Sequence, residues 1–297
     1  MPNLTLHIVD VFAEEKYAGN QLAVVEDGRQ LSSIEMQKIA KEMHFSETSF
    51  ILSDKKRQGG YDVRIFTPET ELPFAGHPTL GTAYIILREI IKKPVEKIVL
   101  NLKVGPITVT PTYNAQGQLD IVWMKQKQPT FGQTFEAEVI APVLNLDVAD
   151  IETAFPIQEV STGVPDIIVP LKTLSAVKRA RIDKDKYNKL IENIESKSIF
   201  IFSPETYHRQ NHLNARMFAD YYGVPEDPAT GSANGCLAAY LVKHRYFGQD
   251  QINIRVEQGY EIGRPSLLLL KAKQGKGEMI DVNVGGRVQP IAKGELL

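Results

Sequence analysis

The amino-acid sequence predicts a mixed α+β protein built from two domains of like topology. Several short segments have apolar residues at every second position, which is typical of strands, and others combine helix start signals with helical apolar spacing. The same order of strands and helices occurs twice along the 297 residues. That length suits two domains of about 150 residues each. We expect domains at residues 1–116 and 117–283, with residues 284–297 forming a strand that could return to the first domain.

The first predicted elements are two strands joined by a tight turn. Apolar residues alternate in residues 4–12, and an apolar strand pattern returns in residues 21–25. Between these segments, Gly19 and Asn20 can supply the positive φ that a tight turn requires. The pattern therefore predicts an early pair of strands.

A helix is predicted at residues 31–43. Ser32 is placed to cap its first turn, and Glu35 follows three residues later to complete a capping box. Leu31 and Met36 have the spacing of a hydrophobic staple across the same turn. These signals fix where the helix begins.

The rest of the first half predicts two strands and a second helix. Residues 49–52 and 61–67 have strand patterns, and the glycine-containing segment 71–81 leads into a predicted helix at residues 82–91. This helix must end before Pro94, because proline disfavours helical geometry in the residue before it.

The second half repeats this order. Strands are predicted in residues 162–171, 198–202 and 214–220, a helix at 184–194, and a glycine-containing segment at 228–235 before a helix at 236–244. Three landmarks of the first half correspond to three of the second: Gly19 to Gly163, Arg64 to Arg216 and Gly76 to Gly231. Both arginines are the first residue of an Arg-x-Phe sequence. We interpret the repeat as an internal duplication; a chance match between ordinary strands and helices is the alternative.

Composition and charge argue for a small-molecule partner. The 34 basic and 36 acidic residues leave a net charge of −2, so no strong field attracts nucleic acid or anionic lipid. The early residues do not have the pattern of a secretory signal, and no apolar run approaches the length of a membrane span. The single cysteine, Cys236, excludes an intrachain disulfide framework and fits a reducing compartment. We expect a cytoplasmic protein that binds neither nucleic acid nor membranes.

Two helix starts rich in small residues, AGHPTLG and ATGSANG, are the first candidate binding elements. The first backbone N–H groups of a helix lack intrahelical partners and carry partial positive charge, so they can bind a carboxylate or another anion. We expect the backbone near Gly76 and Gly231 to bind in this way, across an interdomain cleft if the two halves are related by a pseudo-twofold axis. Close helix–strand packing is the alternative reason for these glycines. Neither segment is a P-loop or a dinucleotide fingerprint.

Four side chains near these segments could carry chemistry. Glu47 begins an apolar strand, where partial burial would favour a general base, although a glutamate in a solvated turn is the alternative. His77 could move a proton or cap a helix. Asp227 and Ser232 flank the second helix start and could bind substrate or serve as caps.

The two histidines of YHRQNH are candidate metal ligands by their spacing. His208 and His212 are four residues apart, a spacing that could place both on one helical face. The segment has little helical pattern and no third ligand nearby, so we expect no metal site.

Several motifs together resemble the PhzF family of phenazine biosynthesis-like proteins: Gly19-Asn20, FSETSF, ELPFAGHPTLGTA and EDPATGSA. The resemblance covers essentially the whole chain. It implies the diaminopimelate epimerase-like fold, with two pseudo-symmetric domains that each wrap a mostly antiparallel, barrel-like sheet around a central helix. It also implies an active site in the interdomain cleft and a homodimer.

The resemblance further implies a cofactor-independent isomerase that needs no metal. The characterised phenazine enzyme isomerises trans-2,3-dihydro-3-hydroxyanthranilate, and its proton-moving glutamate corresponds to Glu47. His77, Asp227 and Ser232 would assist. The substrate, a small carboxylate-bearing molecule of cyclic or amino acid type, would be bound by Gly76, Gly231, Asn20 and Thr230.

Two-thiol epimerase chemistry is not expected. Cofactor-free amino-acid epimerases of this fold carry a cysteine at each helix start, one on each face of the substrate carbon. The corresponding residues here are Ala75 and Thr230, and we expect Cys236 to pack as a small apolar residue inside the second helix. A non-catalytic small-molecule-binding or scaffold protein that uses the same cleft is the alternative function.

Overall fold

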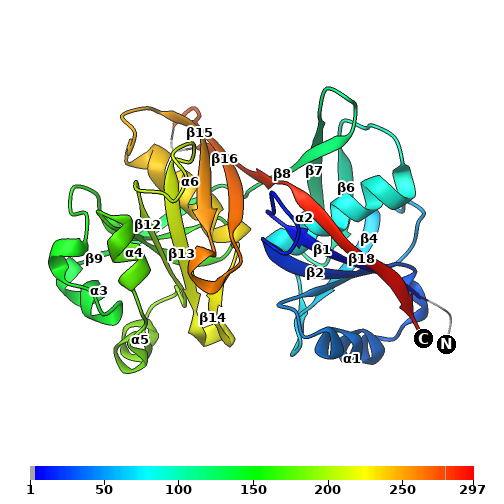
Figure 1. The fold of residues 1–297 in the computed structure, drawn as a ribbon, viewed down its shortest axis with the longest axis horizontal. Helices are drawn as coiled ribbons and strands as arrows, with labels where there is room; N and C mark the ends of the chain where they lie inside the picture. Colours follow the sequence, from blue (N-terminus) through cyan, green and yellow to red (C-terminus); the bar gives the residue numbers. More distant parts are fainter. Residues whose placement is uncertain (1–3, 278) are drawn as a thin grey trace. The chain divides into compact units, whose positions relative to one another are not determined.

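The computed structural model describes residues 4–277 and 279–297, which form a mixed α+β fold (Figure 1). The described chain divides into two compact units, residues 4–125 with 285–297 (unit 1) and residues 126–284 (unit 2). The domain boundary at residues 116 and 117 stays a prediction. None of the helices in the described ranges is long and apolar enough to span a membrane.

Within its described residues, unit 1 has nine complete strands, the end of a tenth strand and two α-helices. Its elements are β1 (Leu4–Val11), β2 (Asn20–Val25), α1 (Ser33–Met43), β3 (Thr48–Ile51), β4 (Tyr61–Phe66), β5 (Glu71–Leu72), α2 (Gly76–Ile85), β6 (Ile98–Leu102), β7 (Gly105–Tyr113), β8 (Leu119–Lys125), the end of β17 (Ile280–Gly286) and β18 (Val288–Leu296). Strand β1 pairs antiparallel with β18 and β2, β2 pairs parallel with β3, and β3, β4 and β5 are antiparallel neighbours. Strand β4 also pairs parallel with β6, which begins the antiparallel set β6, β7 and β8.

Unit 2 repeats this pairing scheme. Its elements are β9 (Thr130–Phe135), α3 (Ala137–Val143), β10 (Ile157–Ser161), β11 (Pro165–Pro170), α4 (Leu174–Arg179), α5 (Lys184–Ile191), β12 (Ile199–Ser203), β13 (Leu213–Ala219), β14 (Val224–Asp227), α6 (Gly231–Lys243), β15 (Gln251–Gln258), β16 (Ser266–Gln274) and most of β17. Strand β10 pairs antiparallel with β9 and β11, β11 pairs parallel with β12, and β13 pairs antiparallel with β12 and β14 and parallel with β15. The internal repeat that the sequence indicates therefore corresponds to a repeated order of parallel and antiparallel strand pairs.

Helix α1 begins where its sequence signals place it. The Ser32 hydroxyl accepts a hydrogen bond from the Glu35 backbone N–H at 3.2 Å, and the Glu35 carboxylate accepts one from the Ser32 N–H at 2.7 Å. Leu31 packs against the apolar cluster that contains Met36. The predicted capping box is therefore confirmed.

The predicted starts of the second and last helices are wrong by about one and a half turns. Helix α2 begins at Gly76 and α6 at Gly231, not at residues 82 and 236. Glycine and proline usually indicate loops, which is why the sequence predicted a later start. Pro78 is the third residue of α2, however, and the N–H groups of the first helical turn have no intrahelical partner, so the N–H that proline lacks is not needed there. The small-residue segments thus form the first turns of the helices.

Close packing explains the second glycine of each segment. Helix α2 contacts β1, β2, β3, β6 and β8, and a Cβ atom on Gly81 would lie 2.6 Å from Leu22 Cδ2 and 2.8 Å from Val11 Cγ2. Helix α6 contacts β10, β11, β15 and β16, and a Cβ on Gly235 would lie 3.1 Å from Thr162 Oγ1. The packing interpretation therefore holds for Gly81 and Gly235, whereas Gly76 and Gly231 are the first residues of their helices.

A buried carboxyl group in unit 2 makes stability depend on pH. Asp166 on β11 is fully buried, and burial raises its pKa to about 7 against the opposing hydrogen bond from the Ser198 hydroxyl at 2.5 Å. Between pH about 4 and 7 the unfolded chain releases this proton while the folded chain keeps it, so stability falls as pH rises. We expect Asp166→Asn to remove this slope, which would raise the melting temperature relative to wild type more at pH 8 than at pH 5. An equal difference at both pH values would show that Asp166 does not titrate in this range.

Candidate active site

Glu47 and His77 form a close pair in unit 1. Glu47 immediately precedes β3, and His77 is the second residue of α2. The carboxylate Oε2 lies 3.4 Å from the imidazole Nε2, and the two side chains are 16% and 6% exposed. Glu47 is thus partly buried beside an imidazole, and the expectation of a glutamate in a solvated turn is wrong.

His77 is neutral in this environment. Burial lowers the pKa of His77 to about 3, and a hydrogen bond to the Gln21 backbone opposes the shift only weakly. Nε2 of His77 has no hydrogen-bond partner among the described residues. The hydrogen bond to the Gln21 backbone is therefore made by the other ring nitrogen, Nδ1. A ring that donates from Nδ1 carries its lone pair on Nε2, so this lone pair faces Glu47.

The turn before β2 places Gln21 beside His77. Gly19 has a φ of +67°, and a Cβ atom there would collide with the Val11 carbonyl oxygen and lie 2.8 Å from Ala13 Cβ. Only glycine can adopt this positive φ and also leave room for the neighbouring atoms. Asn20, which is 2% exposed, then begins β2 directly before Gln21.

Four more candidate residues, Asp227, Thr230, Gly231 and Ser232, lie together in unit 2, and we refer to this group as the second half-site. Asp227 ends β14, Thr230 is the N-cap of α6, and Gly231 begins the helix. The Thr230 hydroxyl donates a hydrogen bond to Asp227 Oδ2. Asp227 therefore lies three residues before the N-cap, and the expectation that it caps the helix is wrong. The Ser232 side chain is half-buried in the first turn.

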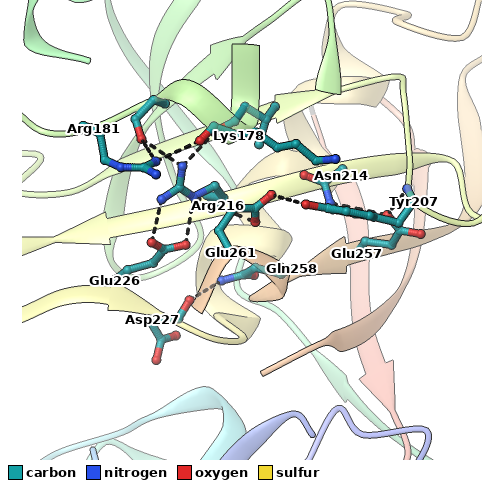
Figure 2. Close-up of polar contacts among 12 residues, drawn as sticks. Lys178, Arg181, Tyr207, Asn214, Arg216, Glu226, Asp227, Glu257, Gln258 and Glu261 are labelled. Carbon is teal, nitrogen blue, oxygen red and sulfur yellow. Dashed lines mark hydrogen bonds and ion pairs between the residues drawn. The ribbon is translucent and has the colours of Figure 1, made fainter. Parts of the chain in front are cut away.

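Gln258 connects the second half-site to the end of β15 (Figure 2). Its Nε2 donates to the Asp227 carbonyl at 2.8 Å and to the Thr230 hydroxyl at 3.1 Å. Its Oε1 accepts from the Thr230 backbone N–H at 3.2 Å and from Asn234 Nδ2 at 2.9 Å. The turn from Asp227 to Asn234 is therefore held by one fully buried amide group.

A paired arginine and glutamate lie ahead of each helix start. In unit 2, Arg216 on β13 donates two hydrogen bonds to Glu226 on β14, at 2.9 and 2.7 Å (Figure 2). In unit 1, Arg64 on β4 donates two hydrogen bonds to Glu71 on β5, both at 2.8 Å. The Arg-x-Phe repeat thus marks equivalent ion pairs, and the strands that they join lead into α2 and α6.

The single cysteine is not one of the residues that open α2 and α6. Ala75 and Thr230, the two positions that two-thiol chemistry would require to be cysteines, are the N-caps of α2 and α6 and so occupy equivalent positions. Cys236 is fully buried, with Sγ 3.7 Å from Thr162 Oγ1 and 3.6 Å from the Val164 carbonyl, and burial raises the pKa of the thiol. The predicted burial of Cys236 is confirmed, but the thiol contacts polar groups and not only apolar ones.

The described residues contain no group of three or more His, Cys, Asp and Glu side chains arranged to hold a metal ion. His208 and His212 lie in a loop, not on a helix. The His208 backbone N–H donates to Glu257, and His212 Nδ1 accepts from the Arg255 N–H. The spacing of four residues therefore does not place the two rings on one helical face.

Comparison with known proteins gives the family. A model of the phenazine biosynthesis-like protein family matches residues 9–294. The chain belongs to the PhzF family. Among curated family relatives, it is 34% identical over 288 residues to trans-2,3-dihydro-3-hydroxyanthranilate isomerase of Pseudomonas aeruginosa, covering 97% of each chain. It is 31% identical over 297 residues to an uncharacterised isomerase of Clostridium acetobutylicum, covering 98% of this chain and 97% of the relative. These names place the chain among isomerases.

Solved structures agree with the family. The PhzF family protein of Bacillus anthracis superposes with a TM-score of 0.90 at 29% identity, covering 100% of both chains. A probable proline racemase from Agrobacterium radiobacter has a TM-score of 0.63 at 10% identity and covers 99% of this chain and 93% of its own. The second match, at this low identity, shows a likeness of fold alone.

Sequence reasoning missed Gln258 and its neighbour Gly259. Gly259 has a φ of +79°, and a Cβ atom there would lie 2.6 Å from the Pro228 carbonyl oxygen. A glutamine followed by glycine, directly after a segment with alternating apolar residues, was the available signal. Nothing in the sequence says which turn that strand end contacts.

Proposed function

We propose that this protein is a cofactor-independent isomerase that moves a proton on a small carboxylate-bearing substrate, with Glu47 as the acid and base. The observation that carries the proposal is the Glu47–His77 pair, in which a partly buried carboxylate lies 3.4 Å from a buried, neutral imidazole. Membership of the PhzF family and its isomerase relatives supports the same reaction class.

The proton transfer uses one carboxylate twice. Glu47 takes a proton from a carbon of the substrate, and the electron pair of the broken C–H bond stays in the substrate's conjugated system. Glu47 then returns the proton to another carbon, which restores the carboxylate. Atoms and charges balance without an added reactant.

His77 suits this cycle because it stays neutral. An imidazolium beside Glu47 would stabilise the carboxylate and weaken it as a base. The neutral ring instead offers the Nε2 lone pair, which can accept a hydrogen bond from Glu47 once the carboxyl group holds the substrate's proton. The pair therefore favours the protonated intermediate state of Glu47.

The second half-site would bind the substrate's polar groups. Asp227 and Ser232 would hold and orient them, and backbone N–H groups at the starts of α2 and α6 would bind the carboxylate. Gly76, Gly231, Asn20 and Thr230 would form this binding surface. The proposal requires both half-sites to act on one substrate, in a cleft between two domains that each wrap a sheet around a central helix. The burial of α2 and α6 supports this architecture.

The substrate class follows from family resemblance. The Pseudomonas aeruginosa relative is named for trans-2,3-dihydro-3-hydroxyanthranilate, a cyclic amino acid, and we propose a substrate of this type. A cytoplasmic homodimer without nucleic-acid or membrane partners is part of the same proposal, supported by the near-neutral net charge of −2.

Deuterium exchange tests the function directly. The purified protein is incubated in D2O with trans-2,3-dihydro-3-hydroxyanthranilate and a panel of cyclic and linear amino acids, and proton NMR follows each C–H signal. We expect deuterium to enter a C–H position of at least one compound only when protein is present. Binding without exchange for every compound would favour the alternative, a non-catalytic small-molecule-binding or scaffold protein.

A further inference from the structure

Gln258 uses its full hydrogen-bonding capacity on the second half-site. A glutamine amide has two N–H donors and an oxygen that accepts two bonds, and all four are engaged between Asp227 and Asn234. The amide cannot be reversed, because its nitrogen would then face the Thr230 N–H and the Asn234 amide nitrogen, which are both donors. The side chain therefore has one orientation.

That orientation fixes the direction of the Thr230 hydroxyl bond. The hydroxyl has a single proton, and its oxygen accepts the N–H of Gln258 at 3.1 Å. Its own proton is thereby directed to Asp227 Oδ2, where the hydroxyl donates. The three residues form a one-way chain of hydrogen bonds from Gln258 through Thr230 to Asp227.

The backbone beside Gln258 is built for close approach to this turn. Gly259 has a positive φ of +79°, and a side chain there would collide with the Arg264 carbonyl and with the Pro228 carbonyl at 2.6 Å. Two independent features, the buried amide and the adjacent glycine, thus bring the end of β15 against the turn that carries Asp227.

We propose that Gln258 is a positioning residue of the active site. It orients the Thr230 hydroxyl, which holds the Asp227 carboxylate in place to bind the substrate. This inference rests on the proposed function, because it assigns Gln258 to the machinery that acts with Glu47.

A double-mutant cycle tests the role. In Gln258→Glu the new carboxylate has no donor and accepts the Thr230 hydroxyl proton, which withdraws that proton from Asp227. We expect kcat/KM for trans-2,3-dihydro-3-hydroxyanthranilate to fall by about 10-fold to 100-fold. In a Thr230→Val background there is no hydroxyl to redirect, so adding Gln258→Glu should change kcat/KM by less than about 3-fold. If Gln258→Glu lowers kcat/KM by the same factor with and without Thr230→Val, the proposal is overturned.

A core variant separates positioning from simple destabilisation. Leu268 on β16 is fully buried, and Leu268→Ala destabilises unit 2 without changing a polar contact of the turn. Well below the melting temperature, Leu268→Ala should lower kcat/KM only slightly. It should lower kcat/KM by the same factor in wild type and in Thr230→Val. A loss in Leu268→Ala as large as that in Gln258→Glu would show that Gln258 acts through stability alone.

Amide hydrogen exchange gives a readout that does not depend on turnover. We expect the peptide covering residues 228–236 to exchange at least about 10-fold faster in Gln258→Glu than in Leu268→Ala. If wild type turns over nothing but this difference is present, the proposed reaction fails and the positioning of the turn by Gln258 stands. If exchange is the same in both variants, the positioning role fails whatever the activity.

Discussion

Glu47→Gln is expected to lower kcat by about 10²-fold to 10⁴-fold, the contribution typical of a positioned general acid and base. The substitution keeps the size of the side chain and removes only its ability to take and return a proton. 3-Hydroxyanthranilate is an aromatic analogue that has no acidic C–H proton to transfer. Its affinity should stay within about 3-fold of wild type, because the protein groups that bind the substrate are unchanged. Steady-state kinetics and titration calorimetry measure the two effects separately.

Glu42→Gln is the matched control for this prediction. Glu42 lies five positions earlier, on the exposed surface of α1, so the same chemical change should leave kcat and affinity unchanged. Retention of most wild-type activity in Glu47→Gln would remove Glu47 from the mechanism. A parallel loss of analogue affinity would instead assign Glu47 to substrate binding.

Arg216→Met is expected to cost about 3–5 kcal/mol in the free energy of unfolding, the range for breaking a buried ion pair from one side. The Arg216 side chain is 3% exposed, and Glu226 is 10% exposed. The variant leaves the Glu226 carboxylate buried without its guanidinium, and it removes the donors to the Val177 and Ala180 carbonyls near the end of α4, at 2.8 and 2.9 Å. Urea unfolding followed by circular dichroism measures the loss.

The internal repeat supplies the control. Arg64 makes the same two-bond contact with Glu71, but both side chains are about one quarter exposed, so water can replace the lost partner. Arg64→Met should therefore cost only about 1 kcal/mol. Equal losses in the two variants would mean that burial does not determine the strength of these pairs. Recovery of stability in Arg216→Met with Glu226→Leu would confirm that the uncompensated carboxylate causes the loss.

The sequence predicts best what neighbouring residues decide together. Ser32 and Glu35 are three residues apart, and the hydrogen bonds between them start α1 as expected. The strand patterns succeed for the same reason, since alternation is a local property. The starts of α2 and α6 failed because glycine and proline have low helix propensity, and the packing that overrides it lies elsewhere in the chain.

Contacts between distant segments could not be predicted from the sequence. Gln258 and Asp227 are 31 residues apart, and their hydrogen bond depends on how the end of β15 meets the turn before α6. The Glu47–His77 pair joins the start of a strand to the first turn of a helix. Family resemblance singled out both residues, but the neutral state of His77 follows only from its burial and its bond to Gln21.

The pairing of β18 with β1 has a consequence for biosynthesis. The two strands run antiparallel from the Leu4–Leu296 pair to the Val11–Val288 pair, so two segments that are far apart in the sequence meet within one sheet. During translation β1 emerges long before its partner β18, because the two strands are far apart in the sequence. Throughout that interval one side of β1 is an unpaired strand edge, open to association with other nascent chains. Strand β18 must emerge from the ribosome before the sheet of unit 1 can be completed.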